Sequence, residues 1–169
     1  TSSTVDGTYG VGLVIPILVT FSENVNVTGT PTITLETGAT DQVVTYSSGS
    51  GSTTLIFNYT VQPGDANADL DYLSTSALAG TIKDVSLNNA NLTLVAPALG
   101  NVGSISDNQD IVIKTNPPTV LAVTSSTIDG SYGVGVVIPI LVRFSEIVNV
   151  TGTPTITLET GTTDQVVNY

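Results

Sequence analysis

The residues best suited to chemistry form an acidic loop. Residues 64–71 read GDANADLD, so oxygen-bearing side chains occupy every second position: Asp65, Asn67, Asp69 and Asp71. In an extended backbone such side chains point to one side, and Ca²⁺ takes about six to eight oxygen ligands. The loop is not an EF-hand, because Leu70 replaces the required glycine and Ser76 the required glutamate. We expect either a calcium site or a solvated loop whose Asp and Asn side chains cap turns.

A second set of acidic residues flanks Pro117-Pro118. Asp110 precedes this pair, and Asp129 and Glu146 follow it. Asp6 and Glu23 occupy the positions that match Asp129 and Glu146 near the start of the chain. Carboxylates on both sides of a linker could share a calcium ion and stiffen the joint. The alternative is that the aspartates fill Asp-Gly turns and the glutamates are exposed.

Catalysis is poorly supported. The chain has no His and no Cys, so its many Ser and Thr hydroxyls have no usual activating base. A net charge of −11 argues against nucleic acid and anionic membranes as partners, and favours solubility and divalent cations. No apolar run approaches the roughly 20 residues of a membrane span. We therefore expect a protein that is not an enzyme and has no membrane span.

One stretch of the chain occurs twice. Residues 1–46 return as residues 124–169, at an offset of 123, and only seven of the 46 aligned positions differ. This period is far longer than the roughly 20–50 residues of a solenoid unit and matches one small domain. We expect residues 1–116 to be one domain that lacks its first strand. Residues 117–169 are then the N-terminal part of the next copy, and nothing equivalent to residues 117–123 precedes Thr1.

Short strands separated by turns fill the repeat. Alternating apolar residues predict strands at 14–21, 24–28, 32–37, 42–47 and 53–62. Further strands are expected at 81–85, 90–95 and 109–114, with a helical turn or irregular crossover at 73–79. Seven or eight such strands predict an all-β fold, an Ig-like β-sandwich with Greek-key connections, in tandem repeats of 123 residues.

Several motifs resemble a known family. The segments DG-x-YGVG-x-VI from Asp6, VTGTP-x-ITLETG from Val27, L-x-FNYTVQPGD from Leu55 and GTIKD from Gly80 are similar to Ig-like tandem repeats of giant bacterial cell-surface proteins. These include adhesins, surface layers and swimming-associated proteins. The resemblance covers residues 1–116 and 124–169. Its hairpin motif D-x-x-G-N matches Asp84–Asn88, with Leu87 in place of glycine, and we expect an Asx-type turn there.

The resemblance implies a structural role outside the cell. The expected function is that of a stalk, spacer or filament-forming unit in adhesion or surface-layer assembly, with neighbouring copies as partners. The alternative is a module that binds a glycan or a protein through its loops. A lectin-like module should show a concave site with aromatic rings, whereas a spacer should not.

A final candidate is an apolar stripe on the outer face of the first strong strand. It consists of Val14, Pro16 and Leu18, and the second copy repeats it as Val137, Pro139 and Leu141. A sandwich strand normally carries polar residues on that face. The stripe is either covered within its own domain or an interface between neighbouring stalks.

Overall fold

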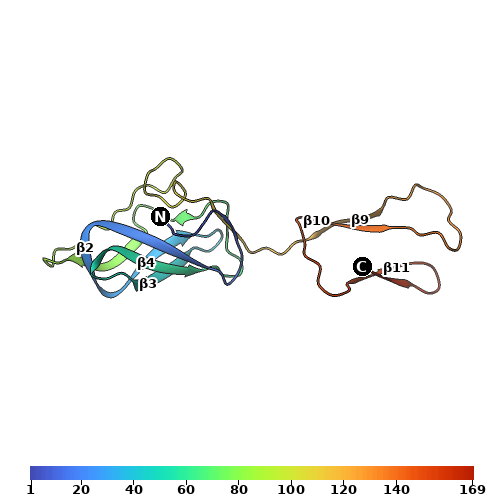
Figure 1. Ribbon diagram of the computed structural model, residues 1–169, viewed down its shortest axis with the longest axis horizontal. Coiled ribbons are helices and arrows are strands. Elements are labelled where there is room, and N and C mark those ends of the chain that lie inside the picture. Colours follow the sequence, from blue (N-terminus) through green and yellow to red (C-terminus); the bar gives the residue numbers. More distant parts are fainter. The chain divides into compact units, whose positions relative to one another are not determined.

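The computed structural model describes all 169 residues and contains strands but no helix. It therefore has no helix that could cross a membrane. The chain divides into two units, Thr1–Asn116 and Pro117–Tyr169, at the Pro117-Pro118 pair (Figure 1). Each unit is described separately below.

The first unit is a β-sandwich of two sheets. The larger sheet has the order β3-β4-β2-β6, with β7 also paired to β2, and the smaller sheet has the order β1-β8-β5. In the smaller sheet β1 runs parallel to β8. The strands are β1 (Gly7–Tyr9), β2 (Val14–Glu36), β3 (Gln42–Ser48), β4 (Ser52–Thr60), β5 (Ala66–Asn67), β6 (Asp71–Tyr72), β7 (Leu78–Asp84) and β8 (Ile111–Lys114). The expectation of an all-β fold is confirmed.

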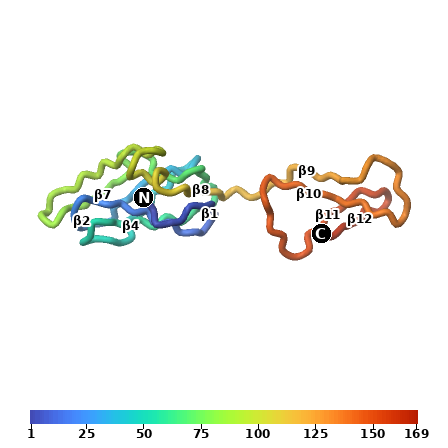
Figure 2. Tube along the Cα trace, turned by 45° about the horizontal axis from the view of Figure 1, so that its top comes forward, coloured from blue at the N-terminus to red at the C-terminus, as the bar shows by residue number.

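Strand β2 joins three segments that the sequence suggested as separate strands. Its first part pairs with β4 from Val14 to Thr20, and its later parts pair with β7 and β3. The chain turns at Gly29, whose φ of 76° lies in the left-handed region that favours glycine. The register with β7 shifts between Thr28 and Thr32. Strand β2 therefore pairs with β4 before the bend and with β7 on both sides of it, and Figure 2 shows the three strands beside one another.

The core of the first unit follows the predicted alternation. Ile15 and Ile17 of β2 and Leu55, Phe57 and Tyr59 of β4 are all buried. The Tyr46 ring meets the Phe57 ring edge-on, with centroids 6.1 Å apart, a favourable aromatic geometry. Side chains of β8 close the core from the smaller sheet, because Ile111 and Ile113 are buried as well.

The second unit consists of two separate antiparallel ribbons. Strands β9 (Val120–Ser125) and β10 (Ile140–Phe144) form one ribbon, and β11 (Thr155–Leu158) and β12 (Gln165–Asn168) form the other. No residue of this unit is buried. Ile138 is 42% exposed, whereas its counterpart Ile15 is 0% exposed. The two ribbons lack the strands that cover the same faces in the first unit.

Some local expectations were wrong. Residues 90–95 form no ladder, although Ala90 N–H donates to Ile82 and Leu94 N–H donates to Thr75. For residues 73–79 one of the two expected alternatives is present, because residues 73–77 form an irregular crossover before β7. Strand β1 lies where no strand was expected, and the acidic loop contains the short strand β5 and the first residue of β6.

Candidate functional site

Asp65 stabilises the acidic loop through internal hydrogen bonds. Its buried carboxylate accepts hydrogen bonds from the Tyr59 hydroxyl at 2.6 Å, the Gln62 amide at 2.8 Å and the Gln42 side chain at 3.0 Å. Its carbonyl accepts from the Thr115 hydroxyl at 2.6 Å. Burial, followed by the hydrogen bond to Asp65, raises the pKa of Tyr59 above its ordinary value. These contacts support the interpretation of Asp65 as a turn-capping residue.

Asp71 is also saturated by internal donors. Its buried carboxylate accepts hydrogen bonds from the Tyr72 amide at 2.8 Å, the Ile105 amide at 3.2 Å, and the Ser106 amide and hydroxyl at 3.3 and 2.7 Å. Asp71 therefore pins the loop around Ser106 to β6. Asn67 likewise donates to the Glu36 carbonyl and accepts from the Asp69 amide. The side chains of Asp65, Asn67 and Asp71 are thus each engaged by groups of the chain itself.

Asp69 differs from its neighbours. Its Oδ1 is buried and has no hydrogen-bond partner. Burial raises the pKa of its carboxyl, a backbone hydrogen bond from Ile111 opposes the rise, and the charges of Asp110, Asp71 and Asp6 add to it. Asp6 itself accepts from the Asp110 amide at 3.0 Å. The structure thus brings one loop residue into the electrostatic field of two residues predicted for the junction.

The remaining predicted ligands lie elsewhere. Glu23 lines a separate cavity of about 300 Å³ together with Asp84 and Asn88. Asp129 and Glu146 belong to the second unit. No group of three or more acidic side chains is arranged to hold a metal ion. Calcium binding by the acidic loop or by the residues that flank Pro117-Pro118 stays a prediction.

The apolar stripe is only partly exposed in the first unit. Val14 is exposed, whereas Pro16 and Leu18 are half-buried. The Pro16 carbonyl accepts from the Ser2 hydroxyl at 2.7 Å. In the second unit Val137, Pro139 and Leu141 are exposed. Association through the stripe stays a prediction.

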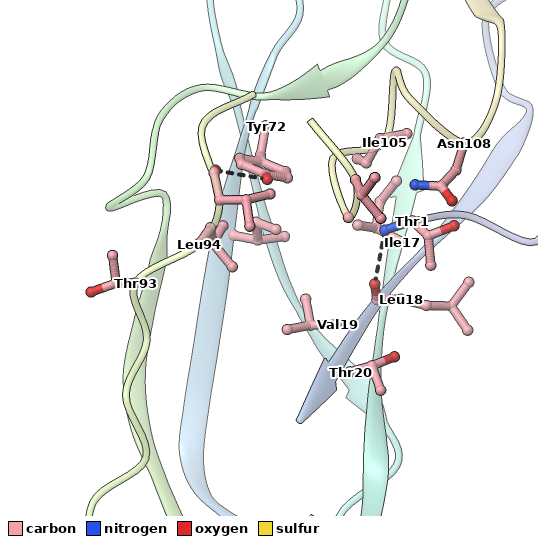
Figure 3. A pocket seen from close by; sticks show the side chains of 14 residues that line it. Thr1, Ile17, Leu18, Val19, Thr20, Tyr72, Thr93, Leu94, Ile105 and Asn108 are labelled. Atoms are coloured by element: carbon pink, nitrogen blue, oxygen red, sulfur yellow. Dashed lines mark hydrogen bonds between the residues drawn. The ribbon is translucent and has the colours of Figure 1, made fainter. Parts of the chain in front are cut away.

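The sequence did not predict a groove along the edge of β2. A cavity of about 410 Å³ opens between residues 18–20 of β2 and residues 93–95, and Figure 3 shows its two walls. The core side chains of Ile33, Tyr72 and Ile105 line it, and no Asp, Glu, Lys or Arg does.

Comparison with known proteins gave no match to any family model, curated protein or solved structure.

Proposed function

We propose that the 123-residue repeat is a structural spacer in a long extracellular protein of a bacterial surface, as a stalk or filament unit. The observation that carries this proposal is that both copies adopt the same strand register. Ser2 pairs with Ile17 in the first copy, and Ser125 pairs with Ile140 at the same offset of 123 residues in the second. Two near-identical sequences with the same strand register suit a structural function that is repeated along a chain.

The chemistry of the unit supports this role. Its carboxylates at Asp65 and Asp71 are engaged in holding loops to strands. The high negative charge keeps a long polymer soluble and resists non-specific association. A Pro-Pro linker is semi-rigid, so it holds successive units apart better than a glycine linker would.

The rival function, glycan binding through loops, receives less support. Of the aromatic side chains, only Tyr72 lines the groove along β2. Its hydroxyl already donates to the Val95 carbonyl at 2.9 Å. A sugar platform usually needs open aromatic faces with polar groups beside them.

Small-angle scattering on proteins of one, two and four joined repeats tests the proposal. A spacer predicts that the maximum dimension rises by a constant increment for each repeat. A matched variant with Gly-Gly in place of Pro117-Pro118 should shorten the average dimension and leave the unfolding temperature unchanged. A maximum dimension that grows only slowly, as for one compact body, would contradict the spacer function.

A further inference from the structure

The Asp6-Gly7 dipeptide is held by the backbone of a single residue, Asp110. The Gly7 amide donates to the Asp110 carbonyl at 2.9 Å, and the Asp6 Oδ1 accepts from the Asp110 amide at 3.0 Å. Gly7 begins β1, which runs parallel to β8 at the edge of the smaller sheet (Figure 2). Asp110 thus engages both the side-chain carboxylate of Asp6 and the backbone nitrogen that follows it.

The fold requires both residues of this dipeptide. Gly7 has a φ of 155°, a conformation that residues with a side chain rarely adopt. The Asp6 carboxylate satisfies the Asp110 amide, which an apolar side chain would leave without an acceptor. The same dipeptide recurs as Asp129-Gly130, at the offset of 123 residues. The repeat therefore places two groups that react with each other side by side in the sequence.

An aspartyl-glycyl bond isomerises spontaneously. The Gly7 nitrogen bonds to the Cγ of the Asp6 carboxyl, one molecule of water leaves, and a cyclic succinimide forms. Water then opens the ring at either carbonyl, which restores aspartate or yields isoaspartate, whose main chain runs through the former side chain. Glycine permits this attack best, because it has no Cβ beside its nitrogen. The two steps release and take up the same molecule of water, so the reaction needs no other reactant.

We propose that Asp6-Gly7 is a latent self-modification site, which the Asp110 backbone keeps unreacted while β1 is paired with β8. In the paired state the Gly7 N–H is directed at the Asp110 carbonyl, and the Asp6 carboxylate is directed at the Asp110 amide. Neither reacting group is then free to turn toward the other. Separation of β1 from β8 breaks both hydrogen bonds and frees both groups together.

Strand β1 can separate while the core stays folded. It has three residues, of which Gly7 and Thr8 are exposed, and β8 is its only strand partner. Short exposed elements of this kind open with a smaller free energy than global unfolding. The core strand β4, in contrast, contributes Leu55, Phe57 and Tyr59, all of which are buried.

Isomerisation makes the separation permanent. Isoaspartate lengthens the main chain at residue 6 by a methylene group and moves the carboxylate away from the Asp110 amide. The register that places Gly7 opposite Ile111 is then no longer available. Each reacted repeat therefore carries a covalent record that its β1 has opened. This inference goes beyond the spacer function, and either can fail without the other.

The rate of isomerisation in the native chain tests the proposal against a peptide of residues 3–10, STVDGTYG. Both are incubated in one neutral buffer, and mass spectrometry with electron-transfer fragmentation measures isoaspartate after digestion. Residue 6 should react at least roughly tenfold more slowly in the chain, because only the open fraction reacts. Asp129 lies in an exposed bend and should react nearly as fast as the peptide. Equal rates for Asp6 and the peptide, or equal slowing of Asp6 and Asp129, would overturn the proposal.

Hydrogen exchange links the slow reaction to strand pairing. Opening of β1 exposes the Gly7 amide to exchange and Asp6 to reaction, so one equilibrium governs both processes. The factor by which the chain slows isomerisation should therefore equal the protection factor of the Gly7 amide in the same buffer. A slow reaction at Asp6 beside an unprotected Gly7 amide would contradict the role of Asp110.

A pair of variants in β8 provides a second test. Backbone groups two residues apart face the same side of a strand, so the Val112 N–H faces β1 as the Asp110 N–H does. Val112→Pro removes this donor and should raise the rate at Asp6 toward that of the peptide. Val112→Ala keeps the donor and should react as slowly as the parent chain. Slow exchange of the β4 amides confirms a folded core in each variant. A folded Val112→Pro chain with the parent rate would overturn the proposal, and the Gly7 comparison decides if this variant does not fold.

Discussion

Thr1 and Leu18 are joined by two backbone hydrogen bonds, from the Thr1 amino group to the Leu18 carbonyl at 3.2 Å and from the Leu18 amide to the Thr1 carbonyl at 2.8 Å. Together with the Ser2–Ile17 bridge, this short contact sets the register of the first edge of the sandwich. Beyond it the edge of β2 is open toward residues 93–95 (Figure 3). In the second unit Thr124 lies opposite Leu141, next to the Ser125–Ile140 pair at the end of the β9–β10 ladder.

The second unit should be protected only when its sheets are completed. Its strands bury no residue, so opening of β9–β12 costs little free energy. We expect the amides of residues 140–169 to exchange rapidly while those of residues 53–62, in and just beyond the buried strand β4, exchange slowly. A chain extended by residues 47–116, placed after Tyr169, should protect both segments equally. Equal protection in the unextended monomer would contradict the requirement for added strands.

Asp71 should be a major contributor to stability. Replacement by Ala leaves the amides of Ile105 and Ser106 without their acceptor, and hydrogen bonds to a charged group contribute about 1.5–3 kcal/mol each. We expect Asp71→Ala to lower the free energy of unfolding by about 3 kcal/mol or more, measured by urea denaturation. Asp107→Ala, with a single exposed hydrogen bond to Gly100, is the control and should cost far less. Similar losses in the two variants would refute the anchoring role.

Asp69 should destabilise the fold at neutral pH. Its pKa is raised in the folded state by burial and by nearby carboxylates, so the native state binds its proton more tightly than the unfolded state does. This penalty is present above the raised pKa and disappears as the pH falls toward the ordinary value of about 4. Asp69→Asn should therefore raise Tm at pH 7, and the difference should shrink in acid. A difference independent of pH would exclude this electrostatic origin.

The Asp69→Asn variant also tests calcium binding. If the acidic loop binds an ion through Asp69, millimolar Ca²⁺ should raise the Tm of the parent chain by ligand linkage. The Asp69→Asn variant should then respond less to Ca²⁺, since it lacks the carboxylate with the unpartnered buried oxygen. Asp84→Asn is a control at an exposed turn. An identical Tm of the parent chain in Ca²⁺ and in chelator would exclude a stabilising calcium site.

Leu87 should be replaceable by glycine with a gain in stability. Its φ of 70° is left-handed, which costs a residue with a side chain about 1–2 kcal/mol, and its side chain is 72% exposed. Glycine adds unfolded-state entropy of roughly 0.5–1 kcal/mol, so Leu87→Gly should stabilise by up to about 1 kcal/mol in thermal unfolding. Val85→Gly in the same turn has no positive φ to relieve and should destabilise. The prediction fails if both variants shift Tm in the same direction.

The period of two in the sequence predicted the main strands and the core of the first unit. It placed Ile15, Ile17, Phe57 and Tyr59 inside, and the Asx-type turn at Asp84 is present, with the Asn88 amide donating to Asp84 at 2.8 Å. The acidic loop was harder to interpret, because alternation alone does not show where a carboxylate finds its donors. Asp71 bonds to Ser106, 35 residues away, and Asp65 to Gln42, 23 residues away. Such contacts depend on tertiary packing.

Force spectroscopy on a chain of many joined repeats tests the spacer function most directly. If each repeat is an independent mechanical unit, unfolding should occur in evenly spaced events. Each event should release the contour length of 123 residues, roughly 400 Å when fully extended, less the length of the folded unit. Irregular events, or a release that does not correspond to one repeat, would contradict it.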